Sequence, residues 1–177
     1  DMSGLMLTIS IADERLLVAL LERRRPGIDT LMRLITRLGN WYVILPVSIA
    51  LALGIVPELQ STGVLAVWTL VGSHVGVQLL KRSFQRERPQ LPAGFERLIV
   101  PEDRFAFPSG HATAGLSVGL SLFIGLAGPA AFVALALGLA IGVSRCYLGV
   151  HYPGDVLTGW MLAILAVLSA ALAGVGY

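Results

Sequence analysis

The stretch SRCYLGVHYPGD, residues 144–155, brings ionisable side chains to the boundary between two apolar runs. Arg145 and His151 stand six residues apart in it, and Asp155 follows the histidine by four residues. Because ionisable side chains at a membrane boundary are costly to bury, a cluster of them marks a candidate functional site. The stretch predicts that His151 attacks a phosphorus atom, that Asp155 orients the imidazole, and that Arg145 holds the phosphate.

The composition of the chain is that of a membrane protein. Of its 177 residues, 55% are hydrophobic and 14% are charged, whereas about a quarter of the residues of a soluble domain are charged. The mean hydropathy is +0.78. The single cysteine, Cys146, excludes an intramolecular disulfide. The net charge of +2 does not indicate a nucleic-acid partner, and nothing in the sequence indicates the oligomeric state.

The apolar runs predict an all-α fold, a polytopic membrane bundle of about five transmembrane helices. The charged triplet Asp13-Glu14-Arg15 excludes a spanning helix near the N-terminus, but leucines at helical spacing after it predict an amphipathic helix that lies on the membrane surface. We therefore expect an interfacial segment over residues 1–27 and a transmembrane domain, with the predicted phosphate site, over residues 28–177. The spanning helices are expected within residues 28–56, 61–80, 108–127, 130–148 and 155–177.

Five spans would place the connecting segments alternately on the two sides of the membrane. The N-terminal segment, the loop of residues 81–107 and the turn of residues 149–154 would then share one side. That side, with the helix ends that adjoin it, carries all 13 Lys and Arg residues. We therefore predict an active site at one membrane face, built from residues of separate segments: Lys81, Arg88, His111, Arg145 and His151.

A basic motif, KRSFQRERP, occupies residues 81–89. Lys81 and Arg88 are seven residues apart, two helical turns, so they share a face if the segment is helical. Pro89 disfavours helix at the residue before it and ends the element. The alternative interpretation is a basic cap that anchors the second spanning helix at lipid headgroups, which suits Arg82 and Arg86.

A second motif, FPSGHAT, occupies residues 107–113 at the start of an apolar helix. Free backbone N–H groups at a helix start, together with the Ser109 hydroxyl, form an anion site, and Gly110 lets the backbone approach an oxyanion closely. His111 stands where it can give a proton to a leaving oxygen. The alternative is a plain Ser cap with a polar interfacial histidine, and the stretch around Arg145 likewise fits a buried Arg–Asp pair.

Taken together, the three motifs resemble those of the type 2 phosphatidic acid phosphatases, also called lipid phosphate phosphatases. That family carries K-x6-RP, then PSGH, then SR-x5-H-x3-D, and this sequence matches every position with unbroken spacing inside each motif. The resemblance covers about residues 28–177 and implies a bacterial, membrane-integrated member. Many bacterial members have six spanning helices, one more than we expect here.

The resemblance implies a role for each motif residue. His151 would form a phosphohistidine intermediate, Asp155 would be the carboxylate beside it, and His111 would protonate the leaving group. The phosphate oxygens would be held by Lys81, Arg88, Ser109, Gly110 and Arg145. Neither a metal nor another cofactor is expected, because these cations take the role that Mg²⁺ has in other phosphoryl-transfer sites, and the sequence has no cluster of carboxylates suited to a divalent ion.

The leading hypothesis is an integral-membrane lipid phosphatase that removes the terminal phosphate from a lipid phosphate or diphosphate. Related bacterial enzymes act on isoprenoid diphosphates, phosphatidylglycerol phosphate or phosphatidic acid. A phosphotransferase with an acceptor other than water would use the same residues, and a non-catalytic protein that binds a phosphorylated lipid is a third possibility. A cysteine phosphatase is excluded, because Tyr152 stands where the Cys-x5-Arg pattern from Cys146 needs an arginine.

Three further expectations concern the location and the neighbours of the site. The resemblance implies the inner membrane of a bacterium with the site facing the periplasm, whereas the Arg-rich N-terminal segment on the same side favours the opposite orientation by the positive-inside rule. His74 is expected either to make a polar packing contact or to line the path of a lipid headgroup. Glu102 and Asp103 are expected to be solvated loop charges or partners of Arg86, Arg97 and Arg104.

Overall fold

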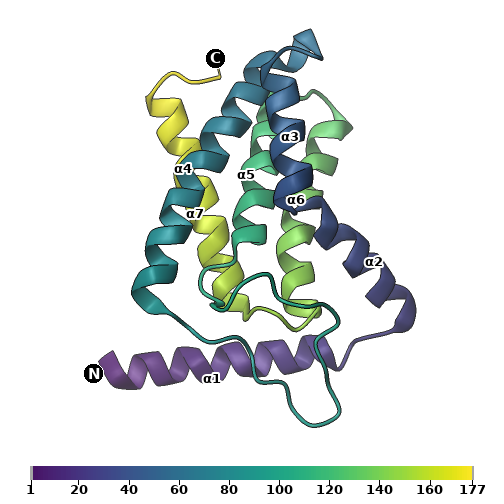
Figure 1. Cartoon of the computed structure of the whole chain (residues 1–177), viewed down its shortest axis with the longest axis vertical. Coiled ribbons are helices and arrows are strands. Elements are labelled where there is room, and N and C mark those ends of the chain that lie inside the picture. Colours follow the sequence, from purple (N-terminus) through teal and green to yellow (C-terminus); the bar gives the residue numbers. More distant parts are fainter. Residues whose placement is uncertain (1, 177) are drawn as a thin grey trace.

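The computed structural model describes residues 2–176, with side chains from residue 11 onward, and its regular structure is helical in that range (Figure 1). The elements in chain order are α1 (Met2–Leu21), α2 (Pro26–Leu38), α3 (Trp41–Ala52), the short 3₁₀ helix η1 (Pro57–Leu59), α4 (Gln60–Phe84), α5 (Gly110–Gly125), α6 (Pro129–Tyr147) and α7 (Pro153–Leu172). The all-α fold is as predicted.

Within the described residues 2–176, three helical segments are long and apolar enough to cross a membrane: Pro57–Phe84, Pro129–Tyr147 and Pro153–Leu172. The helices α2 and α3 pass the same test only as a pair, and they are bent by 48° relative to each other. The helix α5 is apolar but shorter. The structure therefore supports three or four spans by length and composition, and the count of five stays a prediction.

The prediction of a single helix within residues 28–56 is wrong, because the helix is interrupted at Gly39 and Asn40. Asn40 has an extended backbone (φ −67°, ψ 141°) and precedes the first residue of α3. A Cβ atom on Gly39 would lie 2.6 Å from a side-chain carbon of Ile141 on α6 and 3.1 Å from the ring of His111. The break thus brings the start of α3 close to the predicted active-site histidine on α5.

The short helix α5 lies at the centre of the bundle, between α4, α6 and α7 (Figure 1). Ten of its residues are buried, among them His111. It packs closely on α6, where a Cβ atom on Gly138 would stand 2.6 Å from the carbonyl oxygen of Gly115. Small residues let helix backbones approach this closely. The packing fixes the start of α5 relative to the end of α6, where Arg145 lies.

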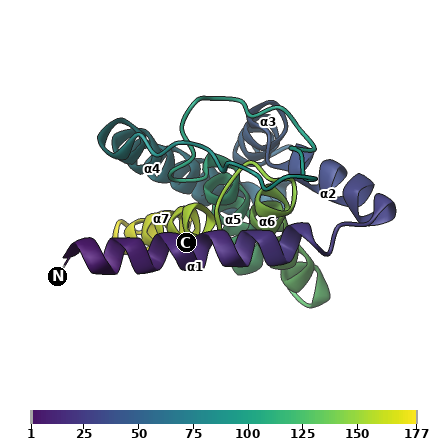
Figure 2. The ribbon, with the colours of Figure 1, turned by 90° about the horizontal axis from the view of Figure 1, so that it is seen from below.

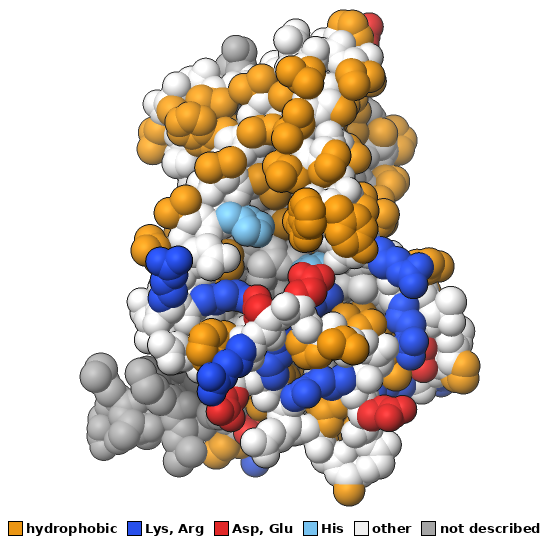
Figure 3. All heavy atoms as spheres, viewed as in Figure 1, with side chains coloured by type: hydrophobic (Ala, Val, Ile, Leu, Met, Phe, Trp, Pro, Cys, Tyr) orange, Lys and Arg blue, Asp and Glu red, His pale blue; other side chains and the backbone are white. Residues whose placement is uncertain are grey.

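One end of the bundle is polar and the other is apolar (Figure 3). The helix α1 runs across the polar end, below the turn that joins α6 to α7, and the loop that joins α4 to α5 lies at the same end and extends past α1 (Figures 1 and 2). Leu17 and Leu21 of α1 are buried there in a cluster with Ala112, Cys146 and Val156. The predicted sharing of one side by these segments is therefore seen in the fold, whereas a position of α1 on a membrane surface stays a prediction.

The loop between α4 and α5 begins later than predicted. The helix α4 continues past Lys81 to Phe84, and Gln85 ends it in the left-handed conformation (φ 44°). Arg88 therefore lies outside the helix, and the prediction that it shares a helical face with Lys81 is wrong. A backbone bridge between Glu87 and Phe105 closes the loop on itself, and this closure returns Arg88 to the neighbourhood of Lys81.

Candidate active site

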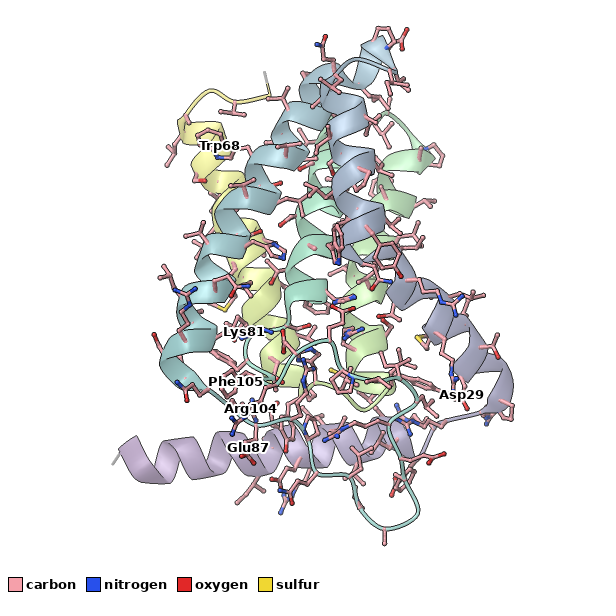
Figure 4. All side chains as sticks on the ribbon, viewed as in Figure 1. Asp29, Trp68, Lys81, Glu87, Arg104 and Phe105 are labelled. Atoms are coloured by element: carbon pink, nitrogen blue, oxygen red, sulfur yellow. The ribbon has the colours of Figure 1, made fainter. Side chains whose placement is uncertain are left out.

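A cavity of about 350 Å³ opens at the boundary between the apolar body and the polar end. Its polar wall contains six of the eight predicted site residues: Lys81, Arg88, Gly110, His111, Arg145 and His151. Its apolar wall is formed by α3 and α4: Trp41, Ile44, Leu45, Leu70, Val71 and Val77. Figure 4 shows Lys81 near the end of α4, beside Phe105 and Arg104 of the loop. Residues of four helices, the loop between α4 and α5 and the turn before α7 thus converge on the cavity.

His151 sits in the turn before α7 and is 2% exposed. Its Nε2 atom lies 2.9 Å from a guanidinium nitrogen of Arg88. Because the guanidinium can only donate, Nε2 accepts this bond and the ring proton is on Nδ1. Burial lowers the pKa of His151 well below 6.5, and the charges of Arg88 and Arg145 lower it further. The imidazole is therefore neutral, with the lone pair of Nε2 at the cavity.

Asp155 lies in the first turn of α7 and is fully buried. One carboxylate oxygen accepts a hydrogen bond of 2.8 Å from the backbone N–H of Tyr152 and lies 3.5 Å from Nδ1 of His151. Nδ1 of His151 has no hydrogen-bond partner among the described residues. A small shift of either ring or carboxylate is enough to form the bond, and such catalytic contacts are often long before substrate binds.

Arg145 is in the last turn of α6 and is 2% exposed. One guanidinium nitrogen donates to the hydroxyl of Thr36 on α2 over 2.8 Å. Its Nε atom has no hydrogen-bond partner among the side chains and backbone that the structure describes. A buried donor on a cavity wall is costly to leave unpaired, so an anion in the cavity would satisfy it. The buried Arg145–Asp155 pair considered above is not formed, since Asp155 binds other groups.

Ser109 precedes α5 and is fully buried. Its hydroxyl accepts a hydrogen bond of 3.4 Å from the N–H of Ala112, and its own N–H donates to the carbonyl oxygen of Asp155 over 3.0 Å. The hydroxyl therefore caps the helix, as in the alternative interpretation, and a contact of Ser109 with phosphate stays a prediction. Gly110, the first residue of α5, lines the cavity.

His111 points its Nε2 atom at two acceptors. The side-chain oxygen of Asn40 lies 2.8 Å away, and a carboxylate oxygen of Glu102 lies 3.2 Å away. Because both atoms accept, Nε2 of His111 carries a hydrogen, as a proton donor to a leaving group must. The hydrogen bond with His111 lowers the pKa of Glu102. Asn40 and Glu102 were not predicted, because only the break between α2 and α3 and the fold of the loop bring them here.

Asp103 bridges the two predicted phosphate-binding cations of the first motif. One carboxylate oxygen pairs with Lys81, and the other accepts from Arg88 over 2.7 Å. Burial tends to raise the pKa of Asp103, but Lys81 and Arg88 outweigh it and the pKa is lowered. Glu102 and Asp103 are both exposed, as expected for solvated loop charges. The expected partners Arg86, Arg97 and Arg104 are wrong, because the two acids pair with His111, Lys81 and Arg88. Two adjacent acids shortly before the second motif are too weak a signal to have revealed these contacts.

Arg86 and His74 also lie close to the site. Arg86 donates to Asp155 and to Asp13, each over 2.8 Å. His74 of α4 lines the cavity, with Nδ1 placed 3.2 Å from the carbonyl oxygen of Leu70. Among the side chains that the structure describes, no group of three or more His, Cys, Asp or Glu residues is arranged to hold a metal ion.

A neutral, buried imidazole whose unprotonated nitrogen faces a cavity walled by Lys81, Arg88 and Arg145 has the features of a phosphoryl-transfer site with a histidine nucleophile. Residues 62–174, more than half of the chain, match the PAP2 superfamily. The chain therefore belongs to the PAP2 superfamily, which confirms the family that the three motifs indicated and the enzyme class, a phosphatase.

Individual relatives agree with this assignment. The chain is 28% identical over 168 residues to phosphatidylglycerophosphatase B of Bacillus subtilis (strain 168), a match that covers 89% of this chain and 80% of that protein. It is 34% identical over 116 residues to a decaprenylphosphoryl-5-phosphoribose phosphatase of Mycobacterium tuberculosis (strain ATCC 25618 / H37Rv), covering 62% of this chain and 61% of the relative.

Solved structures show the same fold. The crystal structure of a transmembrane PAP2-type phosphatidylglycerolphosphate phosphatase from Bacillus subtilis superposes with a TM-score of 0.75 at 26% identity, over 93% of this chain and 85% of that one. Aquifex aeolicus LpxE superposes with a TM-score of 0.76 at 24% identity, over 89% and 93%. With these relatives and its apolar helices, the chain is an integral membrane protein.

Proposed function

We propose that this chain is a lipid phosphatase that removes the terminal phosphate from a lipid phosphate or diphosphate through a phosphohistidine at His151, without a metal ion. The observation that carries the proposal is the hydrogen bond of 2.9 Å from Arg88 to Nε2 of His151. It puts the lone pair of the nucleophile on the cavity side of the ring, next to a cation suited to a phosphate oxygen.

The two walls of the cavity support a lipid phosphate as the substrate. The polar wall suits a phosphate, while the apolar wall between α3 and α4 suits the first carbons of an acyl or isoprenoid chain. Trp41 and Val71 on that wall are 71% and 58% exposed, so a chain can enter sideways from a bilayer. Relatives named for phosphatidylglycerophosphate, decaprenylphosphoryl-5-phosphoribose and undecaprenyl diphosphate have lipid substrates of this kind.

In the first step, Nε2 of His151 attacks phosphorus as the bond from phosphorus to the leaving oxygen breaks. The leaving oxygen takes the proton from Nε2 of His111, and the lipid departs with a free hydroxyl or, from a diphosphate, as the monophosphate. Lys81, Arg88 and Arg145 offset the negative charge on the phosphate oxygens during the displacement. The imidazole becomes positively charged when its nitrogen binds phosphorus, and Asp155 stabilises that charge from the Nδ1 side.

In the second step, water gives a proton to His111 and attacks phosphorus. The bond between phosphorus and Nε2 of His151 breaks, so inorganic phosphate is released and both histidines return to their starting states. Each His111 proton that leaves with the lipid is thus replaced from water, and the cycle balances. We further propose that the protein works in a bacterial inner membrane with the site facing the periplasm, on the grounds of family resemblance.

The test is phosphate release by the purified protein in detergent, with EDTA present, from phosphatidylglycerol phosphate, undecaprenyl diphosphate and phosphatidic acid. The expected result is release of free phosphate from at least one of these lipids and none by the His151→Ala variant. Brief incubation with ³²P-labelled substrate should label wild-type protein with an acid-labile phosphate. The Cys146→Ala variant, which changes a nucleophile buried in the core, should remain active and labelled.

Three results would contradict parts of this proposal. An absolute requirement for Mg²⁺ would exclude the metal-independent mechanism. Full activity in the His151→Ala variant would exclude the phosphohistidine. Transfer of the labelled phosphate to an added alcohol or lipid in place of water would identify the phosphotransferase alternative.

A further inference from the structure

The carboxylate of Asp155 is held by a row of contacts that begins on the N-terminal helix. Asp13 of α1 accepts a hydrogen bond of 2.8 Å from one guanidinium nitrogen of Arg86. The other guanidinium nitrogen of Arg86 donates over 2.8 Å to the oxygen of Asp155 that does not face His151. Arg86 therefore bridges two acids, and the row leads from α1 to the residue beside the nucleophile.

The spacing of buried residues on α1 brings Asp13 to this position. Asp13, Leu17 and Leu21 are separated by four residues, so they lie on one face of the helix. All three side chains are buried, the two leucines against the bundle in the cluster that contains Val156 of α7. Docking of the leucines thus places an acid, 6% exposed, beside the start of α7.

Asp13 also binds the start of α7 directly. Its second carboxylate oxygen accepts from the N–H of Gly154 over 2.7 Å. A Cβ atom at position 154 would stand 2.8 Å from Asp13 Oδ2, so the absence of a side chain there is what allows the carboxylate to approach. Because Gly154 immediately precedes Asp155, Asp13 holds the backbone of the first turn of α7 while Arg86 holds the side chain.

Arg86 is suited to this bridge by its planar fork and its surroundings. Its guanidinium lies over the ring of Tyr152, 4.2 Å from the ring centroid. Burial tends to lower the pKa of Arg86, but the carboxylates of Asp155 and Asp13 outweigh it and the pKa is raised. A lysine in its place would offer one point charge and could not contact both acids with the same geometry. The positive charge also compensates the burial of Asp155, which would otherwise be an unpaired buried charge.

We propose that Arg86 and Asp13 are positioning residues for catalysis, which orient Asp155 and through it the imidazole of His151. The inference rests on the proposed function, since it assumes that Asp155 orients the nucleophile. It makes α1 part of the catalytic unit, although the sequence separates residues 1–27 from the phosphatase domain. Neither Asp13 nor Arg86 lines the cavity, so both act through Asp155 and not on the substrate.

The first test is the kinetics of Asp13→Asn and Arg86→Gln with the lipid that wild-type protein hydrolyses. A misplaced catalytic group costs about tenfold to a hundredfold in rate, so we expect kcat to fall by that factor while KM stays within about twofold. The matched controls are Asp29→Asn and Arg24→Gln. Asp29 accepts from Tyr147 over 2.7 Å, and Arg24 donates to the carbonyl oxygen of Tyr147, so both tie the N-terminal region to the end of α6. Their kcat should stay within about twofold of wild type after correction for the folded fraction.

Double variants separate positioning from a structural role. In the Asp155→Asn background, adding Asp13→Asn should change kcat by less than about twofold, because the residue through which Asp13 acts is already altered. An equal loss in both backgrounds would mean that the contact only stabilises the fold, and would overturn the proposal. One outcome would overturn the positioning roles and leave the proposed function intact: wild type is active, His151→Ala is inactive, and both Asp13→Asn and Arg86→Gln have the kcat of wild type. Full activity in His151→Ala would overturn the function itself.

A spectroscopic measurement gives the answer even where Asp155→Asn is inactive. The chain has three histidines, so the ¹⁵N-histidine spectrum is simple, and comparison with His151→Ala assigns the signals of His151. We expect Asp13→Asn and Arg86→Gln to move the Nδ1–H resonance of His151, because its carboxylate acceptor is displaced. Asp29→Asn should leave this resonance unchanged. An unmoved resonance in Arg86→Gln would overturn the proposal.

Discussion

Asp103 contacts the two cations to which we assign a phosphate, so the Asp103→Asn variant should bind phosphate more tightly. In the structure the carboxylate of Asp103 bridges Lys81 and Arg88. A phosphate can use these two cations fully only if the carboxylate moves away. Asparagine keeps the shape of the side chain and removes the charge, so the competition is weakened without a change in the loop.

The size of the effect follows from the exposure of the pair. The side chain of Asp103 is 49% exposed, while those of Lys81 and Arg88 are 11% and 7% exposed. A partly solvated ion pair contributes about 0.2–1 kcal/mol, so two contacts together contribute about 0.4–2 kcal/mol. Since each 1.4 kcal/mol is about tenfold in affinity, the dissociation constant for phosphate should fall by about twofold to thirtyfold.

The assay is titration of the purified protein with inorganic phosphate, followed by calorimetry at constant ionic strength. Glu87→Gln is the matched control, because Glu87 is an exposed acid of the same loop and is not among the residues that line the cavity. A general effect of net charge would tighten binding equally in both variants. An unchanged or weaker affinity in Asp103→Asn would refute the view that this carboxylate occupies part of the phosphate site.

Four further outcomes are expected. Since burial and the charges of Arg88 and Arg145 lower the pKa of His151 below 6.5, the nucleophile stays neutral as the pH falls through 6.5, and the acid limb of kcat/KM that reports its protonation should lie below that value. Because of the same lowered pKa, His151 takes up a proton near pH 6.5 in the unfolded chain but not in the folded chain. The contribution of His151 to the free energy of unfolding should therefore fall as the pH is lowered through 6.5. Chemical denaturation of wild type and His151→Ala at several pH values would measure it. Arg145→Lys should lower kcat/KM by about tenfold or more, because an ammonium cannot both keep the bond to Thr36 and present a second donor to phosphate, and steady-state kinetics with retained folding would check it. Gly138→Ala should destabilise the bundle by about 1–3 kcal/mol, since its Cβ would stand 2.6 Å from the carbonyl oxygen of Gly115, and a higher or unchanged melting temperature in detergent would contradict the packing described.

Much of the fold was predictable because it depends on local apolar patterns. The four later helices lie within a few residues of the runs from which they were expected. The break between α2 and α3 was not predictable, because the hydrophobic run continues through it and the reason for it lies in the contact of Gly39 with α6 and α5. The hydrophobic pattern could not predict the number of membrane spans either, since the bend of 48° between α2 and α3 and the shortness of α5 are properties of the packed bundle.

The sequence alone determined the candidates for the chemistry of the site. The proposed roles of His151, His111 and Arg145 follow from residue type and from spacing within motifs, since a nucleophile, an acid and a cation must each be encoded as particular side chains. Only the tertiary structure decided what holds them. Asn40, Asp13 and Asp103 contact the site from distant segments of the chain. Arg86 contacts Asp155, although the first motif predicted a site role only for its neighbours Lys81 and Arg88. Such contacts depend on the distances between segments in the folded protein, and spacing along the chain does not determine those distances. The residues that support the site are therefore defined only by the packing of α1, the loop between α4 and α5, and α7.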